Sequence, residues 1–283
     1  MLTSRGSAGG GSRGGRPGNG GSWTDGDAAE VPRERQRLHR RRRQLAVQHA
    51  DRERRGPPPP GGLRQRRAAV PGRAGAGATD IDAVYVSHLH SDHIGGLEWL
   101  GFSTFFNPAA GRPRMFVEQN RVSRLWASSL SGSMSRSGMA KLEDYFDVEP
   151  VPADGGFEWE GQRFELTGML HAMDGPVPLI SFGLRFATGR GCFLITSDTR
   201  FEPERYGALY EWADTIFHDC ETTYRTDGVP APSGIHAHYE ELKTLPAALR
   251  AKLWLYHYQP GWRPDAETDG FRGFVAKGQC FEL

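Results

Sequence analysis

Cysteine is scarce in this 283-residue chain, and its placement excludes two common roles. Cys192, Cys220 and Cys280 lie far apart and form no CxxC pair. Neither a disulfide framework nor a zinc ribbon is therefore expected, because both need paired or closely spaced cysteines. Isolated thiols are typical of a reducing compartment, so we expect a cytoplasmic protein.

Long hydrophobic runs are also missing. No apolar stretch approaches the roughly 20 residues that a membrane-spanning helix needs, and the Gly-rich N-terminus has no apolar signal core. The net charge of +1 at pH 7 gives the chain as a whole little attraction for nucleic acid or for a membrane surface. We expect a soluble protein that uses neither a membrane nor a nucleic acid as its partner.

Large aliphatic side chains are too few in residues 1–79 to form a core. This segment contains Arg but no Lys and is rich in Gly and Pro. One interpretation is a disordered arm whose RRRR (40–43) and RQRR (64–67) neutralise phosphates. The other is a shifted reading frame, since one base out of frame residues 47–53 are compatible with SNMLIE and residues 58–68 with LLVDCGSDA, which resemble two strands. Either way we expect residues 1–79 to be disordered and residues 80–283 to form the functional domain.

From Asp80 onward the sequence alternates strand and helix patterns, as in an α/β domain. Strand-like runs are IDAVYVS (81–87), MFVEQN (115–120), LEDYFDVEPV (142–151), TIFHDCE (215–221) and KLWLYHY (252–258); hairpins are predicted over 157–170 and 179–199, and helices over 203–212 and 239–250. The Ser/Gly tract at 131–138 predicts a mobile loop. Several strands end in His or Asp, and ligands in α/β folds gather at strand ends, so we expect the functional site there.

The loop HLHSDH, directly after the first of these strands, concentrates metal-ligand side chains. His88 and His90 are two residues apart, so an extended backbone lets both imidazoles face one ion, while Asp92 and His93 supply ligands for a second. Isolated candidates that also follow apolar strands are His171, Asp198 and His257. A single histidine is more often an ordinary buried or surface residue, but four ligand side chains in one tight loop predict a metal site. Mixed imidazole and carboxylate donors suit zinc, with manganese as the alternative.

Between Asp80 and Tyr258 the chain resembles the metallo-β-lactamase superfamily in HLHSDH, His171, Asp198 and His257. The resemblance implies an αββα sandwich with two Zn²⁺ ions, or Mn²⁺ in their place, at one edge of its sheets. It implies that one ion is held by His88, His90 and His171, the other by Asp92, His93 and His257, and that Asp198 bridges them. Asp92 would then belong to the catalytic centre too.

Two departures from superfamily patterns qualify this resemblance. An Asp at the bridging position, where antibiotic-hydrolysing lactamases have Cys, points to phosphodiesterases and related hydrolases. Superfamily members also begin with strands that end in a VDCG-like Asp, and no such string occurs in residues 1–79 as written. We therefore expect the N-terminal strands of the sandwich to be missing or disordered here.

The segment IHAHYEEL supplies two further catalytic candidates, His236 and His238. From there to LWLYHY the chain resembles the tRNA 3′-processing endonucleases, in which a His at this place assists the phosphate chemistry, and His236 fits the spacing slightly better. Asp219 or Glu221 in FHDCET could orient that imidazole. Either histidine could instead be a helix cap or a surface residue. Those endonucleases insert a long tRNA-gripping arm between the positions of His171 and Asp198, where this chain has room only for a hairpin.

The strings VYVSHLHSDHIGGLEWLGF, TSDTRF, IFHDCE and HAHYEELKTLPAALRAKLWLYHY resemble the anti-Pycsar cyclic-nucleotide phosphodiesterases of phages and bacteria. The resemblance implies a homodimer that hydrolyses 3′,5′-cyclic mononucleotides to nucleoside monophosphates and counteracts cyclic-nucleotide antiphage signalling. Base contacts could come from Phe102, Phe105, Phe106 or Trp126, although core packing also explains these side chains. Two alternatives stay open: a tRNA- or RNA-processing nuclease of the same superfamily, and an inactive partial domain.

Overall fold

The computed structural model describes residues 45–47, 77–107 and 110–283, and it contains two β-sheets. The first sheet is parallel and has the order β1-β2-β3-β4, with β1 (Leu45–Val47), β2 (Ala83–Val86), β3 (Arg114–Glu118) and β4 (Asp147–Val151). The second sheet has the order β11-β10-β9-β8-β7-β6-β5. Its strands are β5 (Gly156–Trp159), β6 (Gln162–Asp174), β7 (Val177–Thr188), β8 (Gly191–Ile195), β9 (Thr215–Asp219), β10 (Leu253–Tyr256) and β11 (Gly273–Phe274).

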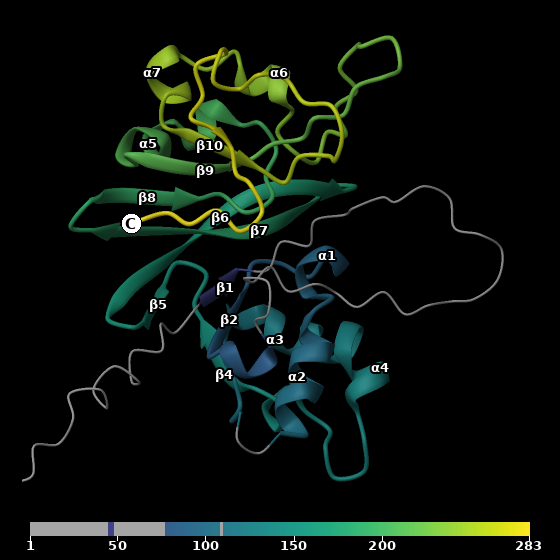
Figure 1. The fold of residues 1–283 in the computed structure, drawn as a ribbon. Coiled ribbons are helices and arrows are strands. Elements are labelled where there is room, and N and C mark those ends of the chain that lie inside the picture. The colour runs from purple at the N-terminus through teal and green to yellow at the C-terminus, as the bar shows by residue number, and fades with distance from the viewer. Residues whose placement is uncertain (1–44, 48–76, 108–109) are drawn as a thin grey trace, which may run out of the picture. The chain divides into compact units, whose positions relative to one another are not determined.

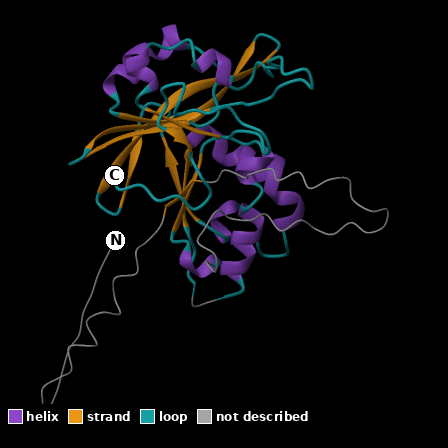
Figure 2. Cartoon of the chain, turned by 45° about the horizontal axis from the view of Figure 1, so that its top comes forward, coloured by secondary structure: helices purple, strands orange, loops and turns teal. Residues whose placement is uncertain are grey.

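Helices cover the outer face of each sheet, as Figures 1 and 2 show. The helices beside the first sheet are α1 (Ser91–Ile94), α2 (Leu97–Phe105), α3 (Val122–Leu125) and α4 (Ser131–Met134). With them lie the short 3₁₀ helices η2 (Ala78–Asp80), η3 (Gln119–Arg121) and η5 (Leu142–Asp144) and the π-helix η4 (Trp126–Leu130). The helices over the second sheet are α5 (Pro203–Trp212), α6 (Tyr239–Leu242) and α7 (Ala247–Arg250). The described residues therefore form the αββα sandwich that the sequence predicts. None of their helices is long and apolar enough to cross a bilayer.

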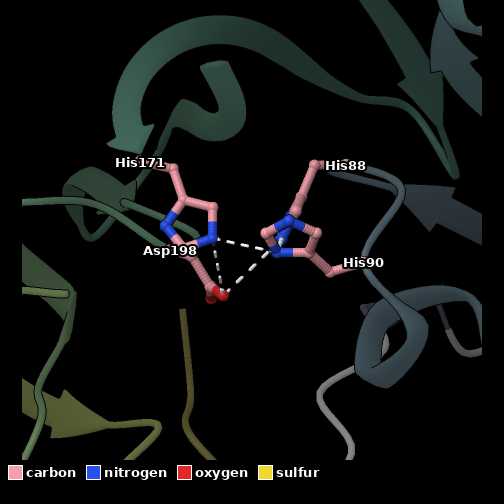
Figure 3. Close-up of side chains that lie close together, drawn as sticks. All are labelled: His88, His90, His171 and Asp198. Carbon is pink, nitrogen blue, oxygen red and sulfur yellow. Dashed lines mark hydrogen bonds and ion pairs between the residues drawn. The ribbon is translucent and has the colours of Figure 1, made fainter. Parts of the chain in front are cut away.

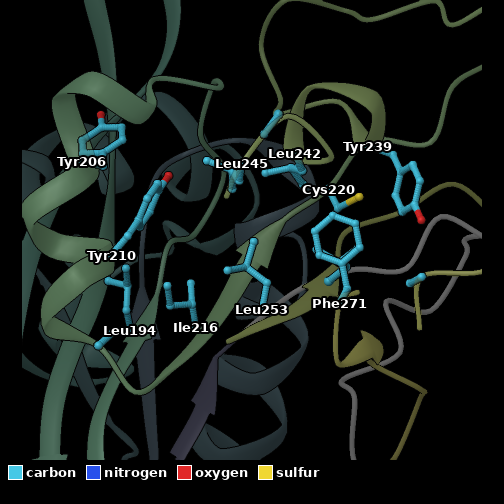
Figure 4. Close-up of a cluster of buried hydrophobic side chains, with 14 of the residues drawn as sticks. Leu194, Tyr206, Tyr210, Ile216, Cys220, Tyr239, Leu242, Leu245, Leu253 and Phe271 are labelled. Carbon is cyan, nitrogen blue, oxygen red and sulfur yellow. The ribbon is translucent and has the colours of Figure 1, made fainter. Parts of the chain in front are cut away.

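Four apolar clusters lie among the described residues, and three of them hold the layers together. Between the sheets lie aromatic and aliphatic side chains that alternate along their strands, including Tyr85, Phe116, Phe157, Phe182 and Leu184. This period of two places one face of each strand in the inter-sheet core and the other face under helices. The cluster under α5 and α6 contains side chains from strands and helices alike (Figure 4), among them Met169, Leu194, Tyr206, Tyr210, Ile216, Tyr239, Leu242 and Leu253. A third cluster packs α2, α3 and η5 against the first sheet.

The predicted elements agree with this architecture except at a few places. The run 142–151, predicted as a strand, begins with η5 and is a strand only from Asp147. The tract 131–138, predicted as a loop, begins with α4, because Met134 is fully buried in the cluster under the first sheet. The single helix predicted over 239–250 is two short helices, since Pro246 has no N–H to continue the first and instead precedes α7. The segment after Pro260, for which no role was predicted, supplies the edge strand β11.

Most of the N-terminal segment lies outside the described residues. Residues 45–47, within the segment expected to be disordered, form β1 and pair in parallel with Ala83–Tyr85. RRRR (40–43), RQRR (64–67) and the string 58–68 lie outside the described residues, as do 48–53 of the other frame-shifted string. The expectations for these stretches stay predictions.

Arg121 joins the two sheets where the loop after β2 begins. Its guanidinium donates to the carbonyl oxygen of Ser87 at 2.8 Å and to that of Ile180 in β7, and it lies 4.5 Å above the Phe182 ring. Beside it, the backbone N–H of Phe182 donates to Ser87 O at 3.0 Å. The start of the metal-ligand loop is thus fixed to both sheets at once.

We predict that Arg121→Ala lowers the free energy of unfolding by about 2–4 kcal/mol, because the Ile180 carbonyl loses this donor, the Ser87 carbonyl keeps only the N–H of Phe182, and the contact with the Phe182 ring is lost. Chemical denaturation with fluorescence or circular dichroism detection measures this change. Arg124→Ala is the matched control, since Arg124 is exposed in α3, three residues further along the chain. Equal stability of the two variants would contradict the role given to Arg121.

Candidate metal centre

The HLHSDH loop turns its ligands inward because of the way β2 ends. All four residues of β2 are buried, and the chain stays extended through His90, which is the N-cap of α1. Extended backbone places His88 and His90 on the same side, while the first turn of α1 brings buried His93 beside them. The Ser87 hydroxyl lies 3.2 Å from Nδ1 of His88 and 3.4 Å from Nδ1 of His93, which helps to fix both rings.

One group of four side chains converges on a common point (Figure 3). Nδ1 of His90 lies 3.1 Å from Nε2 of His88 and 3.0 Å from Nε2 of His171. Oδ2 of Asp198 lies 3.6 Å from Nε2 of His88 and 3.8 Å from Nε2 of His171. Because Nδ1 of His171 donates to Ile235 O at 2.8 Å, its Nε2 keeps a lone pair directed at this point.

A second group shares the same carboxylate oxygen. Oδ2 of Asp198 lies 3.1 Å from Nε2 of His93 and 3.9 Å from Nε2 of His257. Oδ2 of Asp92 lies 3.7 Å and 3.5 Å from the same two nitrogens. The seven predicted ligands therefore fall into the two sets expected from the sequence, and Asp198 belongs to both.

The donor set fits metal ions. Four ligands about 2.0–2.1 Å from a tetrahedral zinc lie about 3.3 Å from one another, and the distances above scatter around that value. Oδ1 of Asp198 is buried and has no hydrogen-bond partner among the described residues. Buried polar atoms normally have a partner, and a cation bound by this carboxylate would compensate for the one that Oδ1 lacks. The residues present thus fit the binding of metal ions.

The protonation states of these side chains suit cation binding. Burial, with the nearby His93, lowers the pKa of His88 to about 2, and burial also lowers the pKa of His171, so both imidazoles are neutral near pH 7. For Asp198, burial alone would raise the pKa, but the hydrogen bond from His93 and the surrounding imidazoles hold it well below its usual range. Neutral imidazole and ionised carboxylate are the forms that bind a metal.

Asp219 is a buried carboxylate that contacts two of the site histidines. Its Oδ2 accepts from Nδ1 of His236 at 2.8 Å and from the backbone N–H of Thr199 at 2.8 Å, while its Oδ1 lies 3.2 Å from Nδ1 of His257. Burial lowers the pKa of His236, but the carboxylate of Asp219 outweighs it and the net shift is upward. The His236 ring lies 5.0 Å from that of His171 and 4.6 Å from that of His257, measured between centroids. His236 therefore stands beside both ligand groups.

His238 and Glu221, both candidates from the sequence, have other partners. His238 is the N-cap of α6, where Nδ1 accepts from Glu240 N at 3.2 Å and Nε2 bonds Thr223 O at 2.9 Å. Glu221 accepts from Thr223 Oγ1 and from both N and Oγ of Ser233, which ties down the loop between them. Of the two candidate carboxylates, it is thus Asp219 that bonds His236. Of the two candidate histidines, it is His238 that caps a helix. Glu241, three residues after His238, was the available signal, because it completes a capping box.

The aromatic candidates for base contacts pack at the end of α2. Phe102 stacks with Phe106 and meets the buried Tyr145 edge to face, and Trp126 also packs on Tyr145. Arg136 lies 5.0 Å above Phe102, so polar and aromatic groups here contact one another. Phe102 and Trp126 pack against the core, which is the alternative that the sequence left open. Phe106, in contrast, is 64% exposed.

Backbone strain marks two positions of the site. Ser197, just before Asp198, has φ 55° and His257 has φ 65°, values that non-glycine residues rarely adopt. Such conformations cost of order 1–3 kcal/mol each and cluster at functional sites, where the surrounding structure enforces them. Here they direct one carboxylate and one imidazole into the same space.

Known proteins share much of this sequence. The sequence profile of the family described as "Anti-Pycsar protein Apyc1" matches residues 66–281. The Apyc1 protein of Paenibacillus harenae is 34% identical over 63% of this chain and 69% of its own, and that of Saccharibacillus brassicae 29% over 74% and 81%.

Solved structures share the fold. The metallo-β-lactamase fold protein YhfI of Bacillus subtilis aligns with a TM-score of 0.53 at 17% identity, over 71% of this chain and 78% of YhfI. Unliganded yeast PDE1 aligns with a TM-score of 0.50 at 12% identity, over 70% of this chain and 67% of PDE1. Fold, ligand arrangement and the long sequence match lead to one conclusion: this chain belongs to the anti-Pycsar Apyc1 family of metallo-β-lactamase fold proteins.

Proposed function

We propose that this protein is a two-metal phosphodiesterase that hydrolyses 3′,5′-cyclic mononucleotides to nucleoside monophosphates, and that it thereby opposes cyclic-nucleotide antiphage signalling. The fold and the candidate metal site support a metal-dependent hydrolase. The observation that carries the finer proposal is that Oδ2 of Asp198 lies in both ligand groups, as a bridging carboxylate would. By the same family likeness we propose a cytoplasmic homodimer that uses Zn²⁺, with Mn²⁺ as a substitute.

Seven side chains would hold the metal ions. His88, His90 and His171 would hold one ion, Asp92, His93 and His257 the other, and Asp198 both. Two bound ions supply Lewis acidity toward phosphoryl oxygens and make water a better nucleophile near neutral pH. Asp92, the most exposed of the carboxylates at 40%, lies where the site opens to substrate.

His236 would act on the leaving group. As water adds to phosphorus and one ring P–O bond breaks, the departing alkoxide oxygen needs a proton, which the imidazolium of His236 can donate. Asp219 holds His236 through Nδ1, so the proton transferred is the one on Nε2. The raised pKa of His236 favours the protonated form that this step requires.

A small substrate fits the connections around the site better than a folded RNA. Between His171 and Asp198 the chain forms only the strands β6, β7 and β8, and the turn from β7 to β8 is Gly189–Arg190. No tRNA-gripping arm is present in this described interval. The alternative of a tRNA nuclease is therefore tested by including a precursor tRNA among the substrates.

The substrate test measures hydrolysis of cyclic CMP, UMP, AMP and GMP, and of a precursor tRNA, by the full chain with added Zn²⁺ or Mn²⁺. We expect turnover of the cyclic nucleotides and its loss with a chelator. Cleavage of the precursor tRNA alone, with a steep salt dependence, would replace the proposal by the nuclease alternative. Failure on every substrate would favour an inactive partial domain.

For Asp198→Ala we predict at least a roughly 10²-fold loss of metal-dependent turnover, since both ions lose a ligand. Elemental analysis of the loaded protein should show fewer ions than the two expected in the unmodified protein, and circular dichroism should show the fold retained. Asp227→Ala removes an exposed carboxylate from a loop and is the control. Full activity of Asp198→Ala would contradict the two-metal assignment.

For His236→Asn we predict that kcat for cyclic AMP falls about 10²- to 10⁴-fold, because the alkoxide must leave without a proton. Hydrolysis of bis(4-nitrophenyl) phosphate should fall much less, since 4-nitrophenolate leaves without protonation. Asp219→Asn should show the same selectivity in weaker form. Equal losses on both substrates would show that His236 serves the site in another way.

A further inference from the structure

We propose that Leu179 and Ile235, extended by Val177, form an apolar rim that holds the nucleobase of the substrate; this inference rests on the proposed function. All three are exposed although they are aliphatic, at 37%, 37% and 57%. A rim without hydrogen-bonding groups would contact the π-face of any base. Purine and pyrimidine cyclic nucleotides would then be accepted alike.

Ile235 and Leu179 both adjoin His171. The backbone carbonyl of Ile235 accepts from Nδ1 of His171 at 2.8 Å, and Ile235 directly precedes His236. Leu179 pairs across the hairpin with Ala172, the residue after His171. The rim therefore begins next to one proposed metal ligand and to the proposed proton donor.

The strand register places Leu179 and Val177 on one face of the second sheet. Along β7, Ile180, Phe182 and Leu184 pack between the two sheets, so the alternate residues 177, 179, 181 and 183 face the helix layer. Ser181 pairs with Met169, whose side chain lies in the cluster under α5 and α6. Ala237, two residues after Ile235, lies in that same cluster. Leu179 and Val177 thus lie on the side of the sheet where the chain that follows Ile235 enters this cluster.

The hairpin that carries the rim is preorganised. Asp174 pairs with Val177 across the two residues Gly175 and Pro176, and Gly175 has φ 58°, as the first position of a tight hairpin turn requires. Pro176 and Pro178 restrict the backbone further. A rigid aliphatic surface can bind a base without first losing conformational freedom.

The dimensions and charges of the hairpin set the direction of the substrate. Leu179 and Val177 are two residues apart, so the rim runs about 6–7 Å outward from the position of Ala172. The exposed carboxylate of Asp174 at the tip would repel a phosphate. The phosphate would therefore lie at the metal ligands and the base along Leu179 and Val177.

The test compares KM and kcat of Leu179→Ser, Ile235→Ser and the double variant on the four cyclic nucleotides and on ribose 3′,5′-cyclic phosphate, which has no base. We expect KM for each nucleotide to rise about 3- to 10-fold per substitution, as the exposed apolar area predicts, with little change in kcat. The base-free substrate should keep its KM. Met173→Ser is the matched control, because Met173 is 46% exposed on the same hairpin but pairs with Pro178 and so lies on the opposite face.

Four outcomes would overturn the rim. They are an unchanged KM in the double variant, an equal rise with the base-free substrate, an equal rise in Met173→Ser, and a change of oligomeric state by light scattering that accompanies the loss. The last would make these residues a contact between subunits. If the unmodified protein hydrolyses no cyclic nucleotide, the proposed function itself fails and the rim fails with it, whereas turnover with an unchanged KM in the variants overturns the rim alone.

Discussion

The site depends on placing one carboxylate, Asp198, where imidazoles from distant parts of the chain surround it. The cost of burying its charge is high unless cations or donors compensate, and its Oδ1 has no hydrogen-bond partner among the described residues. Ser181 donates to the carbonyl oxygen of Asp198 at 2.5 Å, and Arg121 fixes the loop that carries His88. The contacts around this sheet edge thus hold the charged side chain of Asp198 in a buried position that is unfavourable for it alone.

A second layer of contacts gives the histidines their roles. Ser87 lies against Nδ1 of His88, Ile235 O accepts from His171, and Asp219 bonds His236 and approaches His257. Each contact occupies one ring nitrogen and leaves the other for a ligand or a proton transfer. Asp219 is notable because a single carboxylate orients both a proposed metal ligand and the proposed proton donor, so its substitution would disturb both.

The ligands could be predicted from the sequence because they are close together in it or because each directly follows a clearly apolar strand. HLHSDH needs only an extended backbone and one helical turn to form, and His171, Asp198 and His257 each follow an apolar run. The sequence favoured His236 over His238 only slightly and could not choose between Asp219 and Glu221, because the members of each pair are two residues apart and share a face in an extended chain. The choice is made where β9 ends at Asp219 and where α6 begins at Tyr239, and element boundaries are the feature that local patterns define least. The split of 239–250 has the same origin, although Pro246 was visible as a signal.

The ligands come from segments as far apart as His88 and His257, and this has a consequence for how the protein matures. Contacts of such large sequence separation form late in folding, because long loops must close first. During synthesis, the proposed second ion would be captured only after β10 has emerged and paired with β9. A bound metal ion would then stabilise the folded sandwich, and the free energy of this stabilisation would grow with the logarithm of the free metal concentration. In a cell short of the bound metal, turnover of the unfinished chain would then lower the amount of this protein.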